Sequence, residues 1–287
     1  MMQRIRTSGV FWMLASVLAF SVMQLFVRLT SGAVTVYLQV MFRNLAGIFV
    51  AAFFIRKEGG SWFGPLKEQP YLFGRSIAGF LGLIFFFQAS RTASIADATI
   101  VNRTGPFFTT LFSVLFLHER ATAVQWCALG VVFLGGFIAA DPSFDSSAVP
   151  MLYALLSAVA NGAAYTLLAY FRDRVPAMTV IMHFSVFSAA ASIPFLARGF
   201  LLPTVHDLIM LVMIAVLGSC GQIAVTLAYR LAPASEVSIF DQLSVVMSVL
   251  LGWIFLGQEP SAHTFFGGSI VIAASVFIYF YNRRRRR

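Results

Sequence analysis

The sequence predicts an all-α integral membrane protein with ten transmembrane helices, arranged as two inverted repeats of five helices each. Three observations support this fold class. The 287 residues are 59% hydrophobic and 11% charged, with a mean hydropathy of +0.85, whereas a soluble domain has about 25% charged residues. The chain divides into ten apolar runs of bilayer-spanning length. Segments of the two halves also share the same order of charged and small residues.

Each apolar run is expected to form one span, because about 20 helical residues cross the ~30 Å hydrocarbon core. The connections are short, and the longest, 56–70, contains three glycines and two prolines, which favour a loop. The expected spans are residues 10–29, 34–55, 71–89, 95–117, 122–140, 149–170, 178–197, 207–228, 235–256 and 262–281.

The basic residues predict the orientation. With a cytoplasmic N-terminus, 15 of the 20 lysines and arginines, Arg75 among them, fall at cytoplasmic span ends. This excess matches the positive-inside rule and predicts a multi-pass protein of the bacterial cytoplasmic membrane with both termini inside. The five arginines of the tail 283–287 are expected to contact an anionic inner leaflet rather than nucleic acid.

The two halves share a pattern of charges. An offset of 139 residues aligns Arg91 with Arg230 and Asp97 with Glu236. Because each half has an odd number of spans, the second half enters the membrane from the opposite side. Inverted repeats are common in secondary transporters, whose sites lie at the repeat interface. Asp97 and Glu236 lie near span ends, where we expect gating roles.

Two arginines inside spans predict a polar site within the membrane. Arg43 lies in 34–55, with Gln39 one turn earlier, and Arg103 lies in 95–117. A guanidinium at the bilayer centre costs at least ~2.5–3.5 kcal/mol, so it normally faces a protein interior or a watery cavity. Each arginine is expected either to bind substrate or to pair with carbonyls between helices.

The neighbours of Arg103 predict a helix break. Asn102 precedes it, and Pro106 lacks the backbone N–H that would bond a carbonyl one turn earlier. Irregular backbone at membrane depth is tolerated where it lines a cavity.

Asp241 is the third expected key residue, with Gln242 beside it, and at the 139 offset these two lie opposite Asn102 and Arg103. One reading is an Asp241–Arg103 ion pair that touches no substrate. The other is a split site, in which Arg43 or Arg103 grips a carboxylate and Asp241 binds an ammonium group. Alternatively, Asp241 carries a coupling proton, since burial favours the protonated carboxyl.

Other polar residues in the spans extend the predicted substrate site. Each alone is more often a contact between helices than a ligand contact, but together they predict a polar path. They are Gln88, Asn161, Tyr165, His183 and Gln222.

The residues that carry a resemblance to a known family are Arg43 in VMFRNLAG, Asn102, Pro106, and the endings Leu117-His118-Glu119 and Leu256-Gly257-Gln258-Glu259. On these residues the chain resembles the drug/metabolite transporter superfamily, in its ten-span EamA type. The resemblance covers 8–140 and 148–281, which are the two expected five-helix repeats. It implies amino acids, nucleotide-like metabolites or drugs as substrates, commonly exported. Val245 stands where a second copy of Pro106 is expected, so a matching break in the ninth span is not predicted. Glu119 and Glu259 are expected to fix turns or helix ends.

These patterns predict a secondary transporter, an exporter of amino acids or related zwitterionic or anionic compounds by alternating access. An exchanger or importer of S-adenosylmethionine or a nucleotide-like metabolite, and a membrane scaffold, are the alternatives. No motif for ATP binding, hydrolysis or metal ligation is present, and no enzyme activity, metal or cofactor is expected beyond a coupling proton. The expected partners are a small-molecule substrate and the bilayer, and no pattern favours a monomer over a homodimer.

Overall fold

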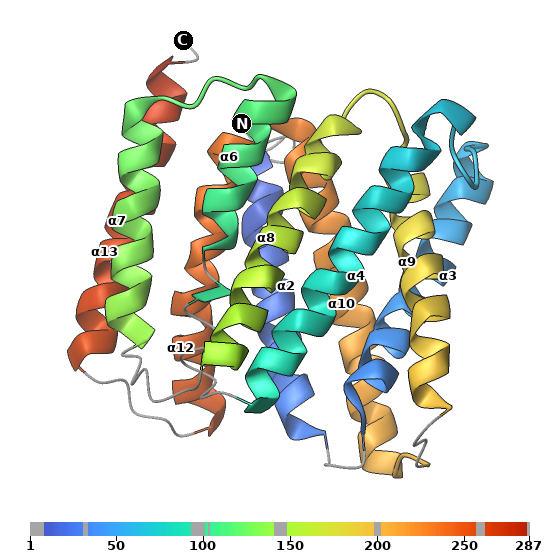
Figure 1. The fold of residues 1–287 in the computed structure, drawn as a ribbon. Helices are drawn as coiled ribbons and strands as arrows, with labels where there is room; N and C mark the ends of the chain where they lie inside the picture. Colours follow the sequence, from blue (N-terminus) through green and yellow to red (C-terminus); the bar gives the residue numbers. More distant parts are fainter. Residues whose placement is uncertain are drawn as a thin grey trace.

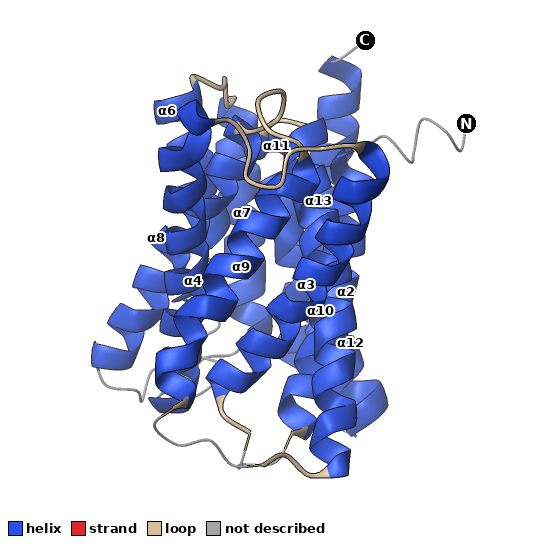
Figure 2. Ribbon diagram, turned by 90° about the vertical axis from the view of Figure 1, so that its right-hand side faces the viewer, coloured by secondary structure: helices blue, strands red, loops and turns tan. Residues whose placement is uncertain are grey.

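The protein is a bundle of helices. A computed structural model describes residues 9–30, 34–92, 101–102, 104–140, 148–197, 202–256 and 262–285. Within these ranges the regular structure is entirely helical (Figure 1), and Figure 2 shows the loops gathered at the two ends of the bundle. The helices are α2 (Gly9–Leu29), α3 (Val36–Glu58), α4 (Gln69–Thr92), α6 (Gly105–Leu117), α7 (Ala123–Ala140), α8 (Ala148–Tyr170), α9 (Ala177–Leu196), α10 (Val205–Leu231), α11 (Ala234–Val237), α12 (Leu243–Leu256) and α13 (Ala262–Arg285), with 3-10 segments η1 (Leu66–Glu68) and η2 (Ser238–Gln242).

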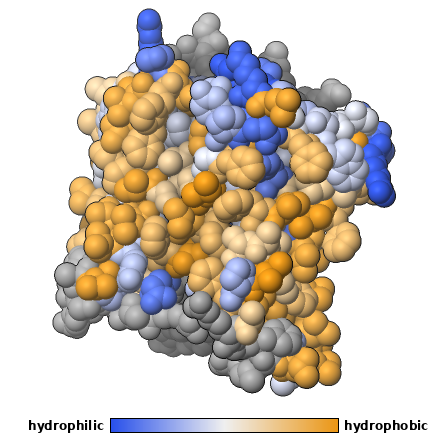
Figure 3. Space-filling model, turned by 45° about the vertical axis from the view of Figure 1, so that its right-hand side comes forward, coloured by the Kyte–Doolittle hydropathy of each residue, from blue (hydrophilic) through white to orange (hydrophobic). Residues whose placement is uncertain are grey.

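Among the residues that the structure describes, five helices are long and apolar enough to cross a membrane: α2, α3, α8, α9 and α10. α6 and parts of α7 and α13 form shorter apolar helices. Apolar side chains cover most of the face in Figure 3, and hydrophilic ones gather toward the end at the top. Phe49 and Phe53 of α3 are 72% and 62% exposed, which suits a lipid-facing surface. The chain is therefore a multi-pass membrane protein.

Local signals set several helix ends. Thr204 caps α10 in a capping box with Asp207, in which each side chain accepts from the other residue's backbone N–H. Gly59 ends α3 with φ of 68°, a left-handed conformation that suits glycine. Arg56 and Lys57 lie in the last turn of α3, where cations complement the helix dipole.

The fourth and ninth expected spans each contain a change in the helical backbone; one was predicted for the fourth, at Pro106, and none for the ninth. α6 begins at Gly105 with Pro106 in its first turn, where the missing N–H has no helical partner to lose. In the ninth span, a 3-10 segment, η2, separates α11 from α12. A break matching that at Pro106 was not predicted in the ninth span because Val245 replaces the proline, yet the backbone changes helix type at η2.

The helices pack in a recurring set of pairs. α2 packs against α10 as α4 packs against α8, α6 contacts α8 as α12 contacts α2, and α3 contacts α10 as α9 contacts α4. α3 also pairs with α9, and α7 with α13; the last pair lies at the left of Figure 1, away from α3 and α9. Exchanging the first five long helices with the last five, in chain order, reproduces the pairs named here, but not the smaller contacts of α10 with α8 and α9 or of α12 with α7 and α13.

Candidate functional site

Glycines on α10 let Arg43 and Phe20 pack closely against that helix. A Cβ added at Gly218 would lie 2.6 Å from Cγ of Arg43, and one at Gly221 would lie 2.6 Å from the Phe20 ring. Arg43 Nη2 donates to Gln222 Oε1 at 3.4 Å, and the guanidinium carbon lies 5.2 Å from the Phe20 ring centroid. These five residues are called the α10 region. The structure thus brings the predicted site residues Arg43 and Gln222 together.

α4 has a matching pair of glycines. A Cβ added at Gly79 would lie 2.9 Å from the Phe184 ring and 3.2 Å from Arg75 Nη1, and one at Gly82 would overlap the Asn161 amide. Gly79 and Gly82 precede the two α10 glycines by 139 positions each. Arg75, Gly79, Gly82, Asn161 and Phe184 are called the α4 region.

Arg75 was expected among the basic residues at cytoplasmic span ends, and the structure shows that it is buried inside the bundle. Its side chain is 2% exposed, and its guanidinium carbon lies 3.8 Å from the Phe184 ring centroid. Within the described part of the chain, Nε and Nη1 are buried with no hydrogen-bond partner. The position itself was a signal: Arg75 is six residues into α4, about 9 Å from its start at 1.5 Å per residue.

His183 lies beside Arg75. Its Nδ1 shares a hydrogen bond of 2.9 Å with Ser76 Oγ, and the Phe73 ring meets it edge-on at 4.7 Å. His183 directly precedes Phe184, whose ring lies against Arg75. This predicted site residue therefore borders the α4 region.

Ser157 joins three elements next to Gly82. Asn102 Nδ2 donates to Ser157 Oγ at 2.7 Å, and Asn161 Nδ2 donates to the same oxygen at 3.3 Å. Ser157 Oγ in turn donates to the Gly82 carbonyl at 2.7 Å. The predicted residues Asn102 and Asn161 therefore share Ser157 as a hydrogen-bond partner, a residue that was not among the predicted site residues.

Two stacked tyrosines join α8 to α10. The rings of Tyr165 and Tyr229 are 5.2 Å apart and 16° from parallel. Tyr165 lies in α8, and Tyr229 lies in α10, where it is fully buried. The pair therefore forms an aromatic contact in the interior of the bundle.

The 3-10 segment η2 carries two predicted residues. Asp241 is partly buried, and Gln242 is 1% exposed. The buried hydroxyls of Thr110 and Ser238 lie 3.0 Å apart, which joins η2 to α6. η2 therefore packs against the helix that begins at the Pro106 break.

The remaining predicted residues are dispersed. Gln39 donates to Thr30 Oγ1 at 2.9 Å, at the start of α3, and Gln88 is exposed on α4. Glu236 lies partly buried in α11. Arg103 and Asp97 lie outside the described residues, so the structure does not test the Asp241–Arg103 pair.

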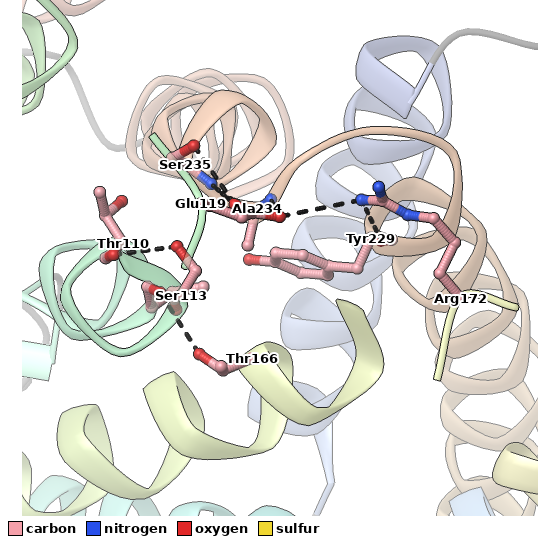
Figure 4. A network of polar contacts seen from close by, with 9 residues as sticks. Thr110, Ser113, Glu119, Thr166, Arg172, Tyr229, Ala234 and Ser235 are labelled. Atoms are coloured by element: carbon pink, nitrogen blue, oxygen red, sulfur yellow. Dashed lines mark hydrogen bonds and ion pairs between the residues drawn. The ribbon is translucent and has the colours of Figure 1, made fainter. Parts of the chain in front are cut away.

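A separate polar network, drawn in Figure 4, closes one end of the bundle. Glu119 accepts hydrogen bonds from the backbone N–H groups of Ala234 and Ser235, both at 3.2 Å. Arg172 Nη2 lies 3.9 Å from the Glu119 carboxylate and donates to the Tyr229 carbonyl at 3.4 Å. The prediction that Glu119 fixes a helix end is confirmed, since it caps α11. Its expected counterpart Glu259 lies outside the described residues.

The sequence profile of the EamA-like transporter family matches residues 7–140 and again 148–280. The pseudopaline exporter of Pseudomonas aeruginosa is 31% identical over 274 residues, covering 94% of this chain and 95% of the relative. The riboflavin transporter of Rhizobium johnstonii is 29% identical over 217 residues, covering 74% of this chain and 71% of the relative.

A solved crystal structure has the same fold. It superimposes with a TM-score of 0.85 and 17% identity, covering 96% of this chain and 98% of the other. At that identity, the likeness concerns the fold alone.

Proposed function

This chain belongs to the EamA-like transporter family and is a small-metabolite transporter, and we propose that it exports a zwitterionic or anionic metabolite by alternating access. The observation that carries the proposal is the placement of Arg43. Its charge lies inside a membrane span, on the glycine face of a neighbouring helix, with a neutral amide and an aromatic ring as its polar contacts. A charge inside a membrane span costs free energy, and residues of this kind usually have a functional role.

The ten long helices would form two inverted five-helix repeats, 8–140 and 148–281. Two observations support this architecture: the most extensive packing pairs are unchanged when the halves are exchanged, and the glycine pairs of α4 and α10 are 139 positions apart. Rocking of one half against the other would expose the central residues to each side of the membrane in turn. The membrane would be a bacterial cytoplasmic membrane, with both termini inside, as the excess of basic residues at those ends favours.

In the proposed mechanism, Arg43 binds a substrate carboxylate through two parallel hydrogen bonds. Tyr165 and Tyr229 provide a flat surface for the body of the substrate. Asp241, at the far side of that surface, balances the ammonium group or carries a coupling proton. The stacking of Tyr165 on Tyr229, and the hydrogen bond of Arg43 to Gln222 on the helix that carries Tyr229, support the placement of the tyrosines beside Arg43.

The test compares metabolites in the medium and in extracts of cells that express the wild type, Arg43→Gln or Arg120→Gln. Arg120 is exposed after α6, so its variant controls for loss of an arginine elsewhere. We expect at least one zwitterionic or anionic metabolite to accumulate in the medium with the wild type and with Arg120→Gln. With Arg43→Gln, its efflux should fall at least tenfold.

Equal efflux from the wild type and Arg43→Gln would refute the proposed site. Unchanged medium in all strains, with all three proteins present in the membrane, would count against export and for a scaffold. Depletion of a metabolite from the medium would reverse the proposed direction.

A further inference from the structure

Arg43 and Arg75 are two positive charges inside the bundle. They come from α3 and α4, which both pack against α9. Phe184 of α9 lies against Arg75, and the next residue, Ser185, packs against Gly47, which follows Arg43 by one turn of α3. Two guanidinium groups in a low-dielectric interior repel each other, and an anion between them would relieve that repulsion.

No carboxylate of the described residues lies within salt-bridge distance of either arginine. Arg43 donates to the neutral Gln222, and Arg75 stacks on the Phe184 ring. The ring contact leaves Nε and Nη1 of Arg75 without a hydrogen-bond partner in the described ranges, although the side chain is 98% buried. Buried donors without partners are rare in folded proteins and call for an explanation.

We propose that Arg75 is a second anion-binding residue, so that the transported metabolite carries two carboxylates, one for each arginine. This inference rests on the proposed function and narrows its substrate class. A ligand with one carboxylate would satisfy Arg43 and leave the Arg75 charge unneutralised. A dicarboxylate neutralises both.

Arg75 is covered in this structure by Phe184, so the second carboxylate reaches it only when that ring moves. The ligand would therefore bind more tightly to the state in which Phe184 has moved away from Arg75. A ligand that binds one of two conformations more tightly shifts the equilibrium toward that conformation. Gly79 has no Cβ, and this leaves the space that the Phe184 ring and Arg75 Nη1 occupy.

The test uses L-glutamate and L-glutamine, which have nearly the same shape and differ by one carboxylate. Thermal unfolding of the purified full-length protein in detergent is followed over increasing concentrations of each, at constant ionic strength. For the wild type, we expect glutamate to bind at least tenfold more tightly than glutamine. For Arg75→Gln, the two affinities should become equal, with the glutamine affinity retained. Arg43→Gln should weaken both.

Gly79→Ala retains Arg75 but pushes its guanidinium aside, because the added Cβ would lie 3.2 Å from Nη1. If Arg75 contacts the second carboxylate, this variant should reduce the preference for glutamate over glutamine. Gly74→Ala is its matched control on the same helix, since the added Cβ would lie 3.7 Å from the nearest atom, an ordinary contact. Equal responses of the wild type to the two compounds, including none to either, would overturn the inference. A glutamate preference that survives in Arg75→Gln would do the same.

The outcomes separate this inference from the proposed function. If efflux depends on Arg43 but the glutamate preference is absent, only the second anion site is lost. If efflux is indifferent to Arg43, the proposed function fails whatever the binding data show.

Discussion

The α10 region and the α4 region have the same packing plan and different chemistry. In each, two glycines three residues apart make room for side chains from two neighbouring helices. In the α10 region, the packed side chains are Arg43 and Phe20; in the α4 region, they are Phe184 and Asn161. The charge enters the α10 region from the neighbouring helix, whereas the α4 region takes its charge, Arg75, from the glycine-bearing helix itself.

This difference separates what the backbone supplies from what the side chains supply. Close approach of helices in a membrane depends on small residues, because lipid offers no hydrophobic driving force for association. The glycines meet that need in both regions. The side chains around them differ between the two regions. Arg43 is partly exposed and has Gln222 as a hydrogen-bond partner, whereas Arg75 is buried against the Phe184 ring. A shared scaffold can thus hold two arginines with different accessibility.

The largest expected effect comes from filling the glycine under Arg43. In Gly218→Ala, the new Cβ meets the Cγ and Cδ atoms of Arg43 at 2.6 and 3.0 Å, atoms too close to the backbone to swing aside. We expect destabilisation of about 1–3 kcal/mol, as for overpacked cores, and at least tenfold lower efflux. Thermal unfolding and metabolite efflux measure the two effects.

Gly130→Ala is the control for that variant, because its Cβ would meet nothing within 4 Å and alanine favours a helix by up to about 1 kcal/mol over glycine. Gly79→Ala should cost less stability than Gly218→Ala, since the atoms it meets are the outer ends of side chains. Equal losses in the two glycine variants would break the comparison between the regions.

The next effect has the opposite sign. Arg75→Met should raise the apparent Tm of the ligand-free protein, because it removes two buried donors that have no partner among the described residues; such donors cost about 1–3 kcal/mol each. Arg43→Met removes a guanidinium with a hydrogen-bond partner and should not stabilise. A lower Tm for Arg75→Met than for the wild type would assign Arg75 a structural role.

A smaller effect distinguishes the two rings. The guanidinium carbon lies 3.8 Å from the ring centroid of Phe184 and 5.2 Å from that of Phe20. Buried cation–π contacts contribute up to about 2 kcal/mol, and the energy falls with distance. Phe184→Leu should therefore lower the apparent Tm by more than Phe20→Leu does. The reverse order in thermal unfolding would mean that packing, and not the arginine contact, sets these energies.

The smallest effect lies outside both regions. Glu119→Gln removes the charge that receives two backbone N–H groups at α11 and faces Arg172. We expect a loss of about 0.5–1 kcal/mol, as for a helix-capping contact, with an unchanged preference for glutamate over glutamine in the unfolding assay. A changed preference would link this end of the bundle to the central arginines.

Much of the candidate site followed from residue type and depth. An arginine or amide inside an apolar run has few stable places except the helix interfaces, so Arg43, Gln222, Asn102 and Asn161 were predicted as site residues, and the structure places them at such interfaces. Their binding of substrate stays a prediction. Arg75 was missed because it was counted among the basic residues at cytoplasmic span ends, although it lies six residues inside α4.

The sequence by itself determined the class of protein, the positions of the apolar helices and the family, because hydropathy and helix length are local properties set by the bilayer thickness. The tertiary structure alone decided which helices are neighbours. Burial of Arg75 under Phe184, stacking of Tyr165 on Tyr229 and the linking role of Ser157 all depend on contacts between distant parts of the chain. Such contacts arise from the close approach that glycines allow between helices, and a glycine in the sequence does not specify which side chain will fill the space it leaves.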